Sequence, residues 1–461
     1  MTSTFVDATT LRARFAARLS ELYGTEVPAY TTLVEVSQEV NRRAMERDPE
    51  TAQRLGSIDR VTAERHGAIR VGSPVELAQV ARVFGALGMY PTGFYDLRDA
   101  APQPIPVVST AFRPTERDEL AANPFRVFTS MLVPEDRRFF DEDLEQRLRG
   151  FIEARRLFPE ELLELADRAE VEQGLDAPSA DRFLELASAS FALSDDPVDR
   201  AWYGELERIS GVAADIGGVT TTHINHLTPR VLDIDDLYRS MEERGIEMID
   251  RIQGPPRWEG PDLLLRQTSF RALSEPRVFR EPDGSVGEGE LRVRFGEVEA
   301  RGIALTPEGR DVYDAAVAEV DRRCAERPDA ARQEIAAQVW AEHIPRTEHE
   351  LWQRGLAFFT YRLRDEIPEG PVPSTFEALV DDGWVDLEPI VYEDFLPRSA
   401  AGIFASNLSG SGSMDTGQGG AERDAAWMSR QIGRDVRLPE ELYSAESEAS
   451  REAVLRELAR R

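Results

Sequence analysis

Residues 65–88 read Arg-His-Gly-Ala-Ile-Arg-Val-Gly-Ser-Pro-Val-Glu-Leu-Ala-Gln-Val-Ala-Arg-Val-Phe-Gly-Ala-Leu-Gly. The beginning of this stretch is typical of an extended strand, and the remainder predicts a helix. Ser73 is suited to cap that helix, Pro74 to occupy its first turn and Gly88 to end it. Three strand-like segments follow at 89–97, 105–113 and 124–132, and the last is rich in aromatic and β-branched residues. The resulting order is one strand, one helix and three strands, a βαβββ unit.

The same order of elements returns later in the chain. Its expected strands are 219–227, 246–252, 262–270 and 289–298, with a helix at 235–245 after the first of them. The two units lack obvious residue identity, so the repeat is one of elements rather than of sequence. We therefore predict an α+β fold of paired βαβββ modules with helical insertions.

Six regions follow from this pattern. The acidic, leucine-rich stretch after the first module has helical periodicity, and a segment rich in glycine and serine precedes the charged end of the chain. We expect N-terminal helices at 1–55, a first module at 56–134, a helical insertion at 135–212, a second module at 213–305, a helical and pocket-closing region at 306–410, and a linker with a charged helical tail at 411–461.

Composition excludes several classes of function. The 461 residues include 85 acidic and 55 basic side chains, a formal charge of −30, so neither nucleic acid nor anionic lipid is an expected partner. Every basic residue is arginine, which excludes Schiff-base lysine chemistry and a Walker A phosphate loop. The single cysteine, Cys324, cannot form an intramolecular disulfide. The sequence has neither a signal-peptide pattern nor a long apolar run, so we expect a cytoplasmic protein.

Histidines are few, and two of the five occupy equivalent places. His66 opens the first module and His223 opens the second. A pseudo-twofold axis between the modules would bring both imidazoles to one point, where a late strand could add Glu297 or Glu299. Two histidines and one carboxylate form the facial triad of non-haem iron enzymes. The alternative interpretation is that these are unrelated polar residues of strands.

Strand periodicity divides the neighbouring candidates only in part. His226 is three residues from His223, so in a strand the two would face opposite sides, and we expect His226 to contact a polar group behind the sheet. Glu297 and Glu299 share one face, and periodicity cannot separate them.

Arg70 is a candidate for substrate binding. It follows His66 by four residues, which in a strand places both side chains on one face, roughly 13 Å apart. Its guanidinium could hold the far carboxylate of a diacid whose near end binds the metal. The alternative is an ordinary surface arginine.

Four motifs resemble one enzyme family. They are Arg-His-Gly-Ala-Ile-Arg at 65–70, Thr-His-Ile-Asn-His-Leu-Thr-Pro-Arg at 222–230, Phe-Gly-Glu-Val-Glu-Ala-Arg-Gly at 295–302 and Tyr-Glu-Asp-Phe-Leu-Pro-Arg-Ser-Ala-Ala-Gly at 392–402. In this order, over about residues 10–410, the chain resembles the 2-oxoadipate dioxygenase/decarboxylase (hydroxyglutarate synthase) family.

The resemblance implies a vicinal oxygen chelate fold, an Fe(II) cofactor and conversion of 2-oxoadipate and O2 to D-2-hydroxyglutarate and CO2 in lysine catabolism. It implies His66, His223 and Glu297 as iron ligands and Arg70 as a ligand of the substrate carboxylate. Pocket-lining residues would include Ser399 and Arg398. Arg398 departs from the small apolar residue usual in the family and could change the preferred acid.

Two alternatives to this function remain. One is a metal enzyme of the same fold that acts on another 2-oxo acid, as an isomerase, or on a catechol. The other is a metal-free protein that binds a small ligand between its modules.

Overall fold

The first module has the predicted elements. The structure, a computed structural model, describes residues 5–49, 64–100, 103–292, 294–407, 414, 420 and 422–460. The module consists of β2 (Arg65–Val71), α5 (Pro74–Gly85), β3 (Tyr90–Asp96), β4 (Val107–Arg113) and β5 (Arg126–Leu132). The Ser73 side chain caps α5 by accepting a hydrogen bond from the backbone N–H of Glu76, as predicted. Residues 56–63 of the expected module lie outside the described residues.

These strands form most of a five-stranded sheet in the order β3-β4-β5-β2-β8, where β8 is His226–Pro229. Strand β2 pairs in parallel with β5 and antiparallel with β8. The parallel pairing requires a crossover, which α5 provides. Strand β2 is therefore central and buried, and it carries both His66 and Arg70.

The second module repeats the order of strand, helix and strands, with three strands in place of four. It contains β8, α12 (Ile234–Glu243), β9 (Leu265–Ser269) and β12 (Glu297–Arg301). A parallel bridge joins Arg230, which follows β8, to Glu299 of β12, and β12 pairs antiparallel with β9. The first strand of each module thus lies beside its last, and the β2–β8 pairing joins the two modules. The predicted paired-module fold is confirmed.

Three strand expectations in this module were wrong. The first strand begins at His226 rather than at 219, because the chain is irregular between α11 (Gly211–Gly217) and Asn225. Segment 246–252 is no strand; near it there are only bridges at Met248 and Gln253, since Gly245 and Gly254 have positive φ and two prolines without N–H donors follow.

The segment expected as a strand at 289–298 is divided. Residues 286–291 form β11, which pairs with β10 (Glu275–Arg280) in a hairpin, and β10 pairs in parallel with β7 (Val198–Asp199). Of the expected segment, only Glu297 and Val298 belong to β12.

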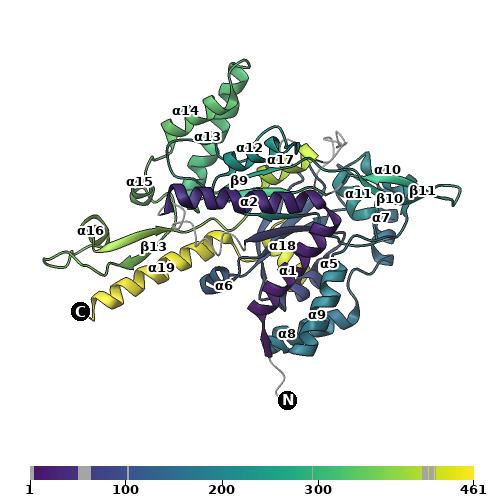
Figure 1. The fold of residues 1–461 in the computed structure, drawn as a ribbon, viewed down its shortest axis with the longest axis horizontal. Helices are drawn as coiled ribbons and strands as arrows, with labels where there is room; N and C mark the ends of the chain where they lie inside the picture. Colours follow the sequence, from purple (N-terminus) through teal and green to yellow (C-terminus); the bar gives the residue numbers. More distant parts are fainter. Residues whose placement is uncertain are drawn as a thin grey trace.

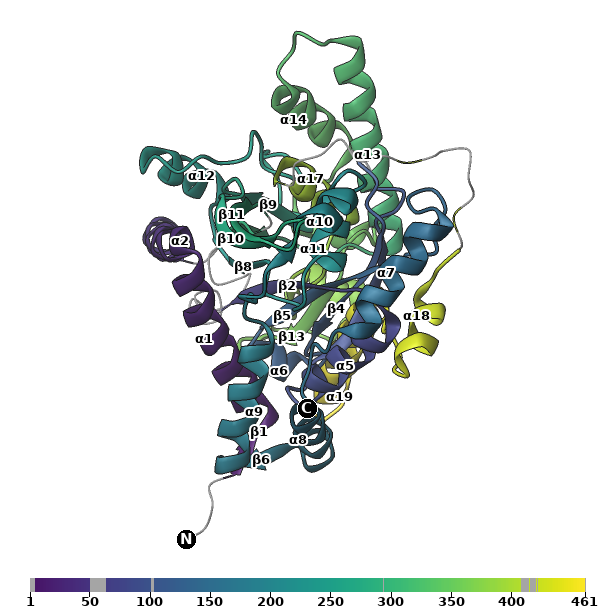
Figure 2. The same cartoon turned by 90° about the vertical axis from the view of Figure 1, so that its right-hand side faces the viewer.

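Helices surround the two modules. In Figure 2 strands β2, β4 and β5 lie between two pairs of helices. On the left are α1 (Ala8–Glu26) and α2 (Pro28–Arg47), and on the right are α7 (Glu142–Ala154) and α18 (Ala425–Ile432). The remaining elements of the N-terminal half are β1 (Phe5–Asp7), α6 (Arg117–Ala122), α7 (Glu142–Ala154), α8 (Glu160–Glu172), β6 (Gly174–Asp176), α9 (Ala177–Ser190) and α10 (Arg200–Glu207).

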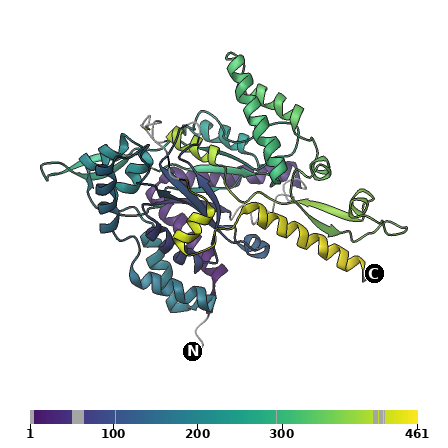
Figure 3. The same cartoon turned by 180° about the vertical axis from the view of Figure 1, so that it is seen from behind.

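The C-terminal half adds two projections (Figures 1 and 3). One is α13 with α14; the other is the β13–β14 hairpin with α16 and α19. Helix α17 instead packs near β9. The bounds are α13 (Pro307–Glu326), α14 (Arg332–His343), α15 (Glu348–Gln353), β13 (Phe359–Leu363), α16 (Phe376–Asp381), β14 (Val385–Pro389), α17 (Pro397–Asn407), α18 (Ala425–Ile432) and α19 (Pro439–Leu458).

One large apolar core runs through both modules and the helices that cover them, and a smaller core that includes Trp384 and Val454 supports the second projection. Among the described residues, no helix has the length and apolar character needed to cross a membrane.

Candidate metal centre

Three buried side chains meet where the modules join. His66 comes from β2, His226 from β8 and Glu297 from β12, and one ligand atom of each lies within 4.8 Å of the other two. The nearest contacts are 3.5 Å from His66 Nε2 and 3.6 Å from His226 Nδ1 to the two Glu297 oxygens. Two imidazoles and one carboxylate are a donor set that suits iron and other first-row transition metals. The residues present therefore fit a metal ion.

His226, not His223, completes this group. The expectation that His226 faces behind the sheet is wrong, because alternation of side chains applies only within a strand. His223 precedes the first residue of β8 and lies in irregular backbone, whereas His226 lies opposite Ala68 in the β2–β8 pairing. Its ring lies 5.4 Å from that of His66.

His223 instead belongs to a second buried cluster with Arg70. Its Nε2 lies 3.2 Å from Asp215 Oδ1 and 3.1 Å from Asn225 Nδ2. The other oxygen of Asp215 accepts hydrogen bonds from Arg70 Nη1 and, at 2.8 Å, from Asn225 Nδ2. Arg70 is thus a buried residue fixed by a carboxylate of α11, and the surface-arginine alternative is excluded.

The structure separates Glu297 from Glu299 through the two nitrogens of one imidazole. His66 Nε2 faces Glu297, and His66 Nδ1 lies 2.9 Å from Glu299 Oε2. Glu299 is also held by Arg301, whose Nε and Nη2 donate to its two oxygens at 2.8 and 2.9 Å. Glu297 is therefore the carboxylate of the candidate metal centre, and Glu299 lies behind His66.

Charges around the centre shift its proton equilibria. Burial opposes protonation of His66, but the carboxylates of Glu299 and Glu297 outweigh it and raise the His66 pKa. Burial and the neighbouring His66 and Arg70 lower the pKa of His226 well below its usual 6.5, so this imidazole is neutral at pH 7. Burial raises the pKa of Glu297, although His66 opposes the change. A neutral imidazole beside a desolvated carboxylate is ready to accept a cation.

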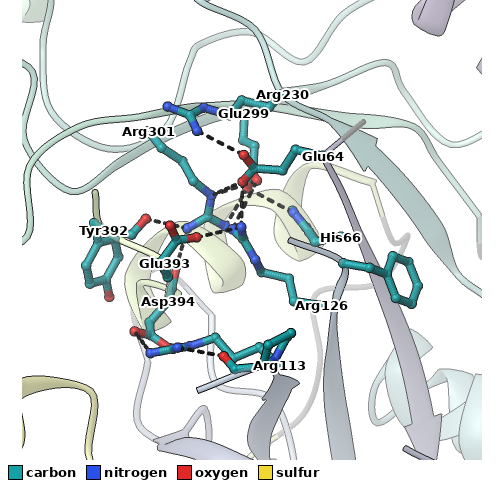
Figure 4. Close-up of polar contacts among 12 residues, drawn as sticks. Glu64, His66, Arg113, Arg126, Arg230, Glu299, Arg301, Tyr392, Glu393 and Asp394 are labelled. Atoms are coloured by element: carbon teal, nitrogen blue, oxygen red, sulfur yellow. Dashed lines mark hydrogen bonds and ion pairs between the residues drawn. The ribbon is translucent and has the colours of Figure 1, made fainter. Parts of the chain in front are cut away.

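A buried network of charges lies behind the centre (Figure 4). Arg126 donates from Nη2 to Glu64 at 2.5 Å and to Glu393 at 2.7 Å, and Arg230 donates to the other oxygen of Glu64 at 2.9 Å. Beyond it, Arg113 forms a two-point contact with Asp394 at 2.9 and 3.0 Å. The segment that carries Glu393 and Asp394 continues to Phe395, whose ring lies 5.0 Å from that of His66.

A cavity of about 890 Å³ opens between α12, α13, α14, α17 and segment 250–256, and its walls include Gln253, Leu396, Arg398 and Ser399. None of the three residues of the metal centre is part of its wall, but Leu396 follows Phe395 directly. Ser399 is buried, as expected for a residue that lines the pocket. The Arg398 side chain is 55% exposed and pairs with Asp321 of α13 at 2.5 Å.

Sequence reasoning missed Asp215 and misplaced His226. Asp215 lies in α11, at the boundary between the helical insertion and the second module. No motif in the sequence around it pointed to a functional role. For His226 the sequence held no sufficient signal, because the start of β8 at this residue is set by pairing with β2.

Known proteins are similar to this chain over most of its length. The sequence profile of the 2-oxoadipate dioxygenase/decarboxylase family matches residues 15–407. A Mycobacterium tuberculosis 2-oxoadipate dioxygenase/decarboxylase is 55% identical over 441 residues, which cover 96% of this chain and 97% of that protein. An Escherichia coli protein of the same name is 39% identical over 457 residues, 97% of this chain and 98% of its own.

A solved structure is also similar over nearly the whole chain. The hydroxyglutarate synthase from Pseudomonas putida in complex with 2-oxoadipate is 37% identical, covers 98% of each chain and has a TM-score of 0.84. The profile match and the relatives that are more than 30% identical show that the chain belongs to the 2-oxoadipate dioxygenase/decarboxylase family.

Proposed function

We propose that this chain is an Fe(II)-dependent dioxygenase/decarboxylase that converts 2-oxoadipate and O2 to D-2-hydroxyglutarate and CO2, a step of lysine catabolism. The observation that carries the proposal is the buried group of His66, His226 and Glu297 at the junction of the two modules. The names of the relatives and the 2-oxoadipate in the Pseudomonas putida complex support the substrate.

His66, His226 and Glu297 would hold the metal on one face. Iron(II) bound there supplies the means to activate O2 next to a chelated 2-oxo acid. His226 contributes by remaining neutral, so that it binds as a ligand without first losing a proton. Glu297 contributes the negative charge, and Gln267 Nε2 orients it with a hydrogen bond of 3.3 Å to Oε2.

Arg70 would hold the distal carboxylate of the substrate. It lies in the same strand as His66 and on the same face, and Asp215 fixes its position before substrate arrives. A planar guanidinium in a fixed position provides a two-point contact for a carboxylate and selects for a diacid.

The segment that follows β14 would close the pocket. Phe395 packs its ring against His66 and excludes water on that side. Ser399 is buried and suited to donate a hydrogen bond to substrate from its hydroxyl or backbone N–H. The Arg398 side chain pairs with Asp321, so we propose that this position contacts substrate only through its backbone.

The test combines metal analysis with turnover. Purified protein should contain or take up iron, consume O2 with 2-oxoadipate, and release a product with the mass of 2-hydroxyglutarate. Absence of bound metal together with tight binding of a small acid would support the metal-free alternative. Oxygen consumption with catechol instead of 2-oxoadipate would support a ring-cleaving enzyme.

Ligand variants test the centre itself. His66→Ala, His226→Ala and Glu297→Ala should each abolish iron binding. His223→Ala is the matched control, because it removes a buried histidine of the same segment that contacts Asp215 rather than Glu297. If His223→Ala lost iron and His226→Ala kept it, the ligand set inferred from the family resemblance would be correct and the one proposed here wrong.

A further inference from the structure

We infer that Glu299 is a positioning residue, which fixes the ring orientation and tautomer of His66 so that Nε2 is the metal-binding nitrogen. This inference rests on the proposed metal centre and adds a role for a residue outside the ligand set.

The contacts of His66 define the orientation. Its Nδ1 lies 2.9 Å from Glu299 Oε2 (Figure 4). Its Nε2 lies 3.5 Å from Glu297 Oε2. A proton on Nδ1, the nitrogen close to the Glu299 carboxylate, would leave the lone pair of Nε2 on the side of Glu297. A carboxylate behind a ligating histidine sets the tautomer in this way and makes the ligand more basic.

The position of the Glu299 carboxylate is itself fixed by its contacts. It is fully buried, and both of its oxygens accept from Arg301. Arg301 also donates from Nη1 to the backbone carbonyls of Tyr392 and Asp394 at 2.7 and 3.1 Å. Phe395 follows Asp394 and packs its ring on His66. Arg301 therefore connects the two groups that contact the His66 ring, the Glu299 carboxylate and the Phe395 ring.

The charges of the cluster balance. The guanidiniums of Arg126, Arg230 and Arg301 lie among the carboxylates of Glu64, Glu299 and Glu393, and all six residues are buried. Three positive charges therefore face three negative ones. The centre obtains a rigid anion behind His66 without an excess of buried charge.

The network offers a matched control. Glu393 is also a buried carboxylate of this cluster, and it accepts from Arg126 at 2.7 Å. The carboxylate that lies 2.9 Å from His66 Nδ1 is that of Glu299. Replacing either carboxylate by glutamine removes one negative charge from the same cluster, but the Glu299 substitution is the one that changes the group behind His66.

The experiment compares wild type, Glu299→Gln and Glu393→Gln as full-length apoprotein. Affinity for Co(II) is measured by titration, the absorption spectrum of the Co(II) complex reports ligand geometry, and thermal unfolding reports the fold. Glu299→Gln should bind Co(II) about 10–100-fold more weakly and with an altered spectrum, the usual consequence of losing a partner behind a ligand. Glu393→Gln should keep the affinity and the spectrum, even if its melting temperature falls by a similar amount.

Two results would overturn the inference while the metal centre stands. One is a Glu299→Gln protein with wild-type affinity and spectrum. The other is equal weakening in both variants, which would mean that the cluster acts only through the stability of the fold. Failure of the wild-type protein to bind Co(II) or Fe(II) would instead refute the proposed metal centre, and the inference with it.

Discussion

Replacing Arg70 by alanine should impair substrate use and stability by separate routes. Arg70 donates to Asp215, whose carboxylate also contacts Asn225 and His223, and all four residues are buried. Removing one partner of a buried ion pair costs about 3–5 kcal/mol of stability, because the other charge stays buried without full compensation. Loss of a charge-assisted contact to the substrate carboxylate costs about 1.5–3 kcal/mol, which corresponds to about a 10–150-fold fall in kcat/KM.

A double variant separates the two effects. Asp215→Asn in the Arg70→Ala background removes the stranded charge and should recover most of the lost stability. It should not recover activity, because the guanidinium that contacts substrate is still absent. The assays are urea unfolding and kcat/KM for 2-oxoadipate, with an apolar 2-oxo acid of similar length as the comparison substrate and iron content as the control.

Two outcomes would refute this reasoning. If activity returned together with stability in the double variant, Arg70 would only support the fold. If the single variant lost equal activity toward both acids, Arg70 would not hold the distal carboxylate.

Three further predictions test other parts of the structure. Burial opposes ionisation of Asp215, but His223 and Arg70 outweigh burial and lower the pKa of this carboxyl below the ordinary 3.8. Ionised Asp215 therefore stabilises the fold fully above pH 3.8, and this contribution is lost as the pH falls below 3.8. The difference in melting temperature between wild type and Asp215→Asn should therefore be constant near neutral pH and shrink below about pH 4. Arg398→Val should change kcat/KM for 2-oxoadipate less than about fivefold, since a half-exposed ion pair with Asp321 contributes under about 1 kcal/mol; a larger change would mean that the side chain contacts substrate. Gly254→Ala should destabilise the protein more than Gly245→Ala in urea unfolding, because both have positive φ but only at Gly254 would a Cβ meet a backbone oxygen, Leu265 O at 2.2 Å; equal losses would contradict the close approach.

Local sequence alone determined much of this protein. The cap at Ser73, the alternation of strands and helix and the repeat of that order were enough to predict paired βαβββ modules, because each depends on interactions among near neighbours. The same patterns placed His66 and Arg70 on one face of a central strand, and Glu297 and Glu299 on one face of a second strand. The absence of lysine excluded whole classes of chemistry, because a Schiff base and a Walker A loop each need an amine that arginine cannot replace.

Tertiary structure decided which of these residues meet. The choice of His226 over His223 depends on where β8 begins, and that point is set by pairing with β2, more than 150 residues earlier in the chain. Periodicity could not separate Glu297 from Glu299, because the two differ in which nitrogen of His66 they approach, and His66 belongs to the other module. Asp215 acquired its role only by approaching Arg70 across the fold. Sequence periodicity fixes which face of an element a side chain occupies, whereas the partners on that face are set by long-range packing.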